Sequence, residues 1–142
     1  MGLLDLASGN SFWKGYDYYK ASMVIGAEQI AGNRYQGTVK GSGKKTYAVT
    51  IDLDHPKKST CTCPHAEGTR RICKHKVALY FSVFPEEADR ALKEAEEWEA
   101  EEEKREQERI EEIRKYVDSL SKQQLREELM QRMVNEMYRK WY

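Results

Sequence analysis

The segment CTCPHAEGTRRICKHK, residues 61–76, constrains this chain more than any other, because it holds all three cysteines and two of the three histidines. An odd number of thiols argues against a disulfide framework. A catalytic thiol needs one cysteine and a base, and redox pairs usually have the spacing CxxC, whereas this segment has CxC. Thiolates together with an imidazole are the ligands of four-coordinate structural zinc, so we interpret the segment as a zinc site.

The spacing of these residues predicts the local backbone. Cys61 and Cys63 are two apart, so they lie on one side of a strand end, and Pro64 then stops the strand. Positions two apart project about 200° apart around a helix. We therefore expect Cys73 in the turn before a helix and His75 in its first turn. His65 is the alternative to His75 as fourth ligand, because it follows Cys63 as His75 follows Cys73.

The sequence predicts both helices and strands around this segment, which indicates an α+β fold. Apolar spacing predicts a helix over 11–22, capped by Asn10 or Ser11, and a short helix over 77–84 ended by Pro85. Strands are expected over 23–30, 34–40 and 47–53, the last with clear alternation. The GSGKK tip at 41–45 lacks the first glycine of a phosphate loop and leads into no helix, so we interpret it as a hairpin turn.

Beyond residue 85 the composition changes to that of a long, solvated helix. Residues 86–103 contain ten acidic and two basic residues, and Ser121 with Gln124 forms a capping-box signature for a last helix. We therefore expect two parts, 1–85 around the zinc site and 86–142 as a charged helical tail with coiled-coil character. An apolar stripe on the last helix is expected to pack against the preceding helix or the zinc module, or to bind a partner. Its members are Leu125, Leu129, Met130, Met133, Met137 and Trp141.

The whole pattern resembles a SWIM zinc finger: it consists of CxC, nine intervening residues, CxH and a short apolar helix. The upstream stretch FWKGYDYYKASMV is also similar to the Gly-x-x-Tyr-Tyr segment that precedes the finger in that family, so the resemblance covers about residues 11–84. It implies a small β-hairpin and helix built around Zn(II), held by Cys61, Cys63, Cys73 and His75. It also implies binding of DNA or protein, the roles attributed to the family, whose catalytic parts lie in other domains.

The charge distribution points to the partner. Residues 1–85 carry 12 basic and 6 acidic residues, and residues 86–142 carry 12 basic and 18 acidic residues. We expect the basic part to bind DNA through a face around the zinc site, with the N–H groups at the start of the Cys73 helix as a second phosphate site. The predicted phosphate contacts are Arg70, Arg71, Lys74, Lys76, Lys57 and Lys58, with the Lys44–Lys45 tip nearby.

The alternative is a protein-interaction adaptor that recruits a partner, or self-associates, through the acidic helical tail. Enzymatic activity is not expected, since we find no catalytic acid–base pair, no open metal position and no nucleotide loop. The start, MGLLDLASGN, lacks the basic region of a signal peptide, and no segment has the length of a membrane span. We therefore expect a cytoplasmic location and no membrane partner.

Overall fold

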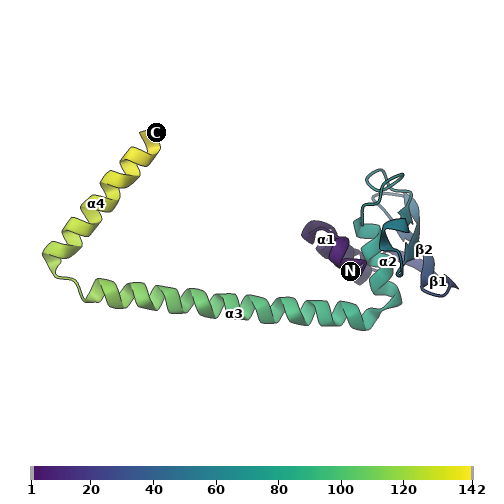
Figure 1. Cartoon of the computed structure of the whole chain (residues 1–142), viewed down its shortest axis with the longest axis horizontal. Helices are drawn as coiled ribbons and strands as arrows, with labels where there is room; N and C mark the ends of the chain where they lie inside the picture. Colours follow the sequence, from purple (N-terminus) through teal and green to yellow (C-terminus); the bar gives the residue numbers. More distant parts are fainter. Residues whose placement is uncertain (1, 142) are drawn as a thin grey trace. The chain divides into compact units, whose positions relative to one another are not determined.

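The computed structural model describes residues 2–141 and contains two compact units, Met1–Lys93 and Glu94–Tyr142. We call them the front unit and the tail unit. The front unit contains a sheet, two helices and the first turns of a third, and the tail unit is entirely helical apart from one short connection (Figure 1). This is the α+β class that the sequence predicts.

The front unit is built on a four-stranded antiparallel sheet with the strand order β1–β2–β3–β4. The strands are β1 (Val24–Ala31), β2 (Arg34–Lys40), β3 (Thr46–Asp52) and β4 (Thr60–Cys61). The GSGKK segment forms the turn between β2 and β3, as predicted, and Gly43 adopts a φ of +67° there. The last pairing sets Val49 of β3 opposite Cys61 of β4, so the short edge strand delivers a cysteine at the end of the sheet.

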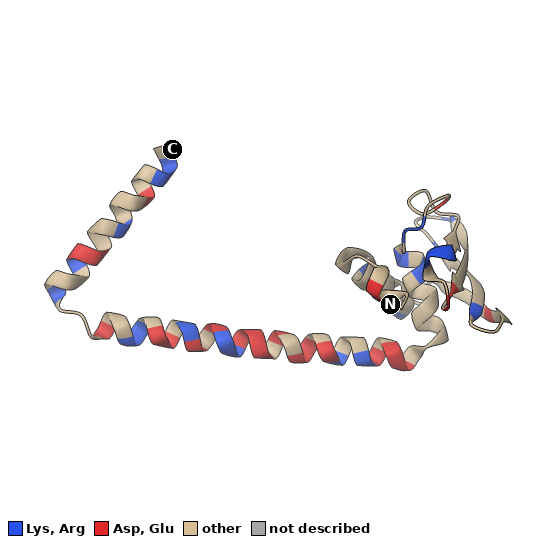
Figure 2. Ribbon diagram, in the orientation of Figure 1, with Lys and Arg blue, Asp and Glu red and all other residues tan. Residues whose placement is uncertain are grey.

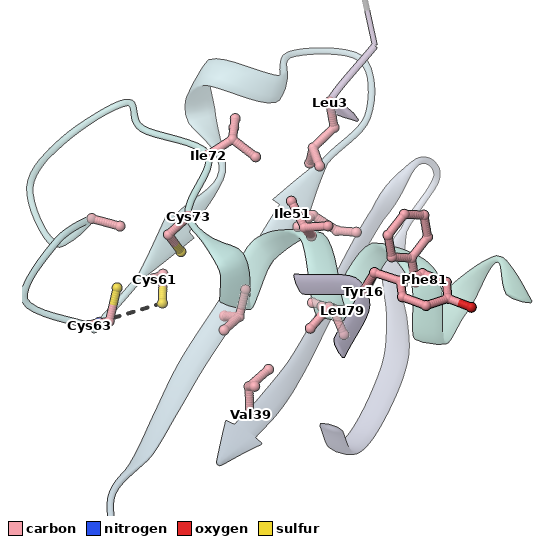
Figure 3. Packing of buried hydrophobic residues seen from close by; sticks show 14 of the residues in the cluster. Leu3, Tyr16, Val39, Ile51, Cys61, Cys63, Ile72, Cys73, Leu79 and Phe81 are labelled. Carbon is pink, nitrogen blue, oxygen red and sulfur yellow. Dashed lines mark hydrogen bonds between the residues drawn. The ribbon is translucent and has the colours of Figure 1, made fainter. Parts of the chain in front are cut away.

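Helices α1 (Gly9–Lys20) and α2 (Lys74–Val83) supply the rest of the core. The predicted caps of α1 are wrong: the hydroxyl of Ser8 accepts the hydrogen bond from the N–H of Ser11 at 3.1 Å, which places the start of the helix at Gly9. In the core, Val39 and Ile51 from the sheet meet Leu79 and Phe81 from α2, all fully buried (Figure 3).

The contact between α1 and α2 depends on Gly15. A Cβ at this position would lie 2.5 Å from the Cβ of Val77 and 2.8 Å from the carbonyl oxygen of Lys74. Both distances are shorter than real Cβ contacts, so only glycine lets the two backbones approach this closely. One turn away, the rings of Phe12 and Tyr16 pack edge-on against Phe81.

Helix α3 (Pro85–Asp118) begins at the residue where the sequence changes character. Pro85 is its first residue, and Glu86 and Glu87 follow in the first turn, where their charges favour the positive end of the helix dipole. The front unit nevertheless extends to Lys93, because Ala88 is buried and Leu92 is half-buried against the core. The first turns of α3 thus belong to the packed structure of the front unit.

Helix α4 (Lys122–Trp141) begins with the predicted capping box: Ser121 N–H donates to the Gln124 side chain at 2.8 Å, and Gln124 N–H donates to the Ser121 hydroxyl at 3.2 Å. Every residue of α4 is exposed. Within the described tail unit, α3 therefore leaves the apolar stripe of α4 uncovered, and its expected packing on the zinc module stays a prediction. Across residues 2–141, no helix has both the length and the apolar character needed to cross a bilayer.

A substitution of Gly15 tests the close approach of α1 and α2. We expect Gly15→Ala to lower the free energy of unfolding of the front unit by about 1–3 kcal/mol, because the added methyl group overlaps Val77. The matched control is Gly9→Ala in the same helix, where a Cβ meets nothing within 4 Å and the stability should not fall. Denaturant unfolding followed by near-UV circular dichroism measures both, and equal stabilities of the two variants would contradict the packing argument.

Candidate metal centre

The four residues that the sequence singles out converge at one end of the sheet. Cys61 ends β4, Cys63 follows two positions on, Cys73 is the N-cap residue of α2, and His75 lies in its first turn. All four side chains are buried, and their ligand atoms all lie within 4.8 Å of one another. Figure 3 shows the three sulfur atoms, which come from the strand end and from the start of the helix, turned toward a common centre.

The distances in this cluster suit a tetrahedral metal ion. Zn–S bonds of about 2.3 Å and a Zn–N bond of about 2.0 Å make the sulfur–nitrogen edge of such a tetrahedron about 3.6 Å long. The Cys61 Sγ lies 3.7 Å from the Nδ1 of His75. The three cysteines form no disulfide, and the donor set of three thiols and one imidazole is the one that structural zinc prefers. The donor set and the proximity of the four ligand atoms therefore fit a zinc ion.

The thiols already influence one another electrostatically. The pKa of the Cys73 thiol is lowered to about 3, chiefly by hydrogen bonding from Cys61, with smaller contributions from His75 and the backbone N–H groups at the start of α2. The same pairing raises the pKa of Cys61, as does its burial. Cys73 occupies the N-cap position, so a metal-ligand candidate lies at the helix end where we expected a second phosphate site. That phosphate site stays a prediction.

Aromatic rings hold the His75 imidazole. Tyr47 lies at 4.7 Å between ring centroids, and Tyr18 meets the imidazole edge-on at 5.6 Å. The structure brings His75, and not His65, to the three cysteines: His65 is exposed and lies outside the cluster. Nδ1 of His75 faces Cys61, while Nε2 is buried without a protein partner.

Lys76 lies inside the protein and not on the surface where we expected it to contact phosphate. Its side chain is fully buried, and Nζ donates a hydrogen bond to the carbonyl oxygen of Arg71. Burial lowers the pKa of Lys76, while the charges of Cys73, Cys61 and Cys63 act in the opposite direction. Three thiolates, a neutral imidazole and Zn(II) carry a net charge of −1, so a buried ammonium beside them offsets that charge. The predicted nucleic-acid contact of Lys76 is thus corrected to an internal counter-charge.

A comparison with family models agrees with this geometry. Residues 47–84 match the model of the SWIM zinc finger, a range that contains β3, β4, the whole cluster and α2. By this match, residues 47–84 correspond to a SWIM-type zinc finger. The match stops short of α1, so the similarity of FWKGYDYYKASMV to the family rests on the sequence alone. No curated protein and no solved structure gave a significant match.

Two grooves border the SWIM zinc finger, and they divide the predicted basic face between them. The first, the metal-side groove, has a volume of about 460 Å³ and is lined by Lys14, Arg71, Lys74, His65 and the start of α1 next to the ligands. The second, the lateral groove, is of similar volume and lies at the short helix η2 (Pro56–Lys58). Its lining includes Lys57, Lys58 and Arg70. Both grooves share Leu6 of η1 (Leu4–Leu6), so they are neighbours.

The sequence analysis missed Lys14. It lies on α1, and the close contact at Gly15 brings this part of the helix against the backbone of Lys74. Lys74 itself is held with its ammonium 4.9 Å from the centre of the Tyr18 ring. The glycine next to Lys14 was the available signal, because a glycine on an aromatic helix face indicates close packing. Lys44 and Lys45 lie in the turn between β2 and β3 and line neither groove.

Metal analysis tests the ligand set. We expect the purified full chain to contain one zinc ion, and the double variant Cys73→Ala/His75→Ala to lose it, because two of four donors are removed. The matched control is His65→Ala, which should retain the metal since His65 lies outside the cluster. Stoichiometric zinc in the double variant, or loss of zinc on changing His65, would contradict this assignment.

A second variant tests the counter-charge. Lys76→Met keeps most of the buried stem and removes the ammonium, so we expect zinc affinity to fall about 10-fold or more. Lys74→Met, at a partly exposed position on the same helix, should change the zinc affinity much less. Competition with a chromophoric chelator measures both affinities. Equal affinities would show that the charge of Lys76 does not act on the metal centre.

Proposed function

We propose that the front unit binds DNA through the metal-side and lateral grooves. The supporting observation is that both are lined by several basic side chains that form no ion pair, with Asp54 of the lateral groove as the acidic residue of the two linings. Within residues 2–141, none of the basic side chains that line either groove forms an ion pair. Unpaired Lys and Arg side chains gathered in neighbouring grooves are the electrostatic footprint of a polyanion site.

The lining favours contacts to the backbone of a duplex. Lys, Arg, Ser and Asn side chains are the common phosphate contacts, and Ser8, Asn10 and Ser11 stand beside Lys14 and Arg71 in the metal-side groove. Single-strand binders instead stack bases on aromatic rings. Among the residues that the structure describes, no Phe, Tyr or Trp lines either groove. We infer that the unit contacts phosphates of double-stranded DNA and carries little base readout of its own.

We also infer that the unit acts by binding and not by catalysis. Four protein donors complete a tetrahedral site, whereas catalytic zinc keeps one position for water or substrate. The metal then holds the end of β4 against the start of α2, and with them Arg70, Arg71 and Lys74. Three thiols that must stay reduced to bind metal suit a reducing compartment such as the cytoplasm.

Salt dependence of DNA binding tests this proposal. With four to six phosphate contacts, we expect a log–log slope of about −4 to −5 on duplex DNA, because each neutralised phosphate releases counterions. Arg70→Ala and Arg71→Ala alter one groove each, so each should flatten the slope by about 1 and weaken all sequences alike. Lys44→Ala, in the β2–β3 turn, is the matched control and should leave the slope unchanged.

The zinc content of each variant must be equal before the slopes are compared. No affinity for duplex DNA at low salt would refute the proposal. Equal slopes for the Arg70→Ala, Arg71→Ala and Lys44→Ala variants would show that the grooves do not contact phosphate.

A further inference from the structure

Helix α4 carries an apolar surface that nothing in the described chain covers. Its large apolar side chains are between 37% and 81% exposed, with Trp141 the most exposed. Together they form one extended apolar surface on a single helix, whereas a typical monomer exposes its large apolar side chains singly or in small patches. A surface of this size on a soluble helix indicates an interaction site.

The apolar residues of α4 form two rows along the helix. One row repeats every four residues and contains Leu125, Leu129, Met133, Met137 and Trp141. The second row, also spaced by four, contains Met130, Val134 and Tyr138. The two rows lie about 90–100° apart around the helix, which is broader than the single seam of a two-stranded coiled coil. Each row can therefore pack against a different neighbouring helix, as in a four-helix bundle.

The end of α3 offers one matching neighbour. Ile110, Ile113 and Val117 are spaced by three and four residues, which is a narrow helical seam, and Leu120 follows just beyond the helix. Ile110, Ile113 and Val117 are between 41% and 61% exposed. One such helix covers one row of α4, and this chain has no second free seam of that length among the residues described. The other row needs a helix from another molecule.

Charge complementarity between α4 and α3 favours a second copy of this chain over other partners, because each copy supplies both helices. In an antiparallel pairing of α4 with α3, Leu129 would stand near Ile110, and Arg139 and Lys140 would stand beside residues 94–103. That stretch contains seven acidic and no basic residues, so in this pairing the basic end of α4 would meet the most acidic part of α3. Figure 2 shows the charged residues along each helix. A nucleic acid would be repelled by this acidic stretch, and so would an anionic membrane surface.

We propose that two copies of this chain dimerise through the tail unit, with α4 and the end of α3 from each copy forming a four-helix bundle. The interaction is isologous, because each copy offers the same two elements. It is independent of the proposed DNA binding, which uses only the front unit.

Sedimentation equilibrium of the zinc-loaded full chain tests this inference. We expect a dimer that persists between 50 mM and 500 mM salt, because apolar burial supplies most of the affinity and is not weakened by screening, whereas the charge contacts are. Met133→Glu should raise the dissociation constant at least 10-fold, because two copies of a charge would enter the bundle. The matched control Asn135→Glu adds the same charge on the opposite face of α4 and should leave the dimer intact.

The emission of Trp141 reports the environment of the same surface. In a Trp13→Phe/Trp98→Phe background, we expect a blue shift as the protein concentration rises through the dissociation constant, and no shift in the Met133→Glu variant. Equal zinc content shows that Met133→Glu leaves the front unit intact. A monomer at 100 µM would overturn the proposal, as would a dimer that withstands Met133→Glu. A blue shift that requires lipid vesicles, without dependence on protein concentration, would overturn it in favour of a membrane surface.

Discussion

The convergence of four side chains at one end of the sheet is the constraint on which the front unit depends. Cys61 and Cys63 come from the end of a two-residue strand, and Cys73 and His75 from the first turn of α2. A strand this short holds few ladder hydrogen bonds, so a metal ion that ties it to a helix supplies what the sheet lacks. Lys76 extends the same arrangement inward, because its buried ammonium offsets the charge of the thiolates. A bound metal would therefore join the strand end and the helix start into one cooperative unit. The positions of the basic grooves depend on this unit.

Much of this site could be predicted from the sequence, because its signals are local. Thiol spacing brings Cys61 and Cys63 together, alternation marks β3, and the pair Ser121 and Gln124 marks the start of α4. The errors arose where tertiary packing decides. Lys74 and Lys76 differ by two positions and look equivalent in the sequence, yet only Lys76 faces the core. Its place three residues after Cys73 and three before Leu79 was the signal for burial, since positions three apart share a helix face.

The two units of the chain are proposed to bind different partners through different physical interactions. The front unit presents cations in grooves, and its proposed binding must weaken with salt. The tail unit presents exposed apolar rows, and its proposed association must persist in salt. A dimer would place two DNA-binding units on one assembly, so that the second contact becomes intramolecular and modest single-site affinity suffices. The two proposals rest on different observations. If both hold, dimerisation would strengthen the proposed DNA binding.

The loop of residues 64–72, which joins the two pairs of ligands, separates two requirements that could otherwise conflict. Only Ala66 and Ile72 of this loop are buried, and the loop satisfies part of its own backbone through the hydroxyl of Thr69. It also carries His65, Arg70 and Arg71 to the grooves. Mutation can lengthen or recharge such a loop at little cost in stability, because closure entropy grows slowly with length. During evolution the ligand geometry can thus stay fixed while the surface offered to a partner diverges.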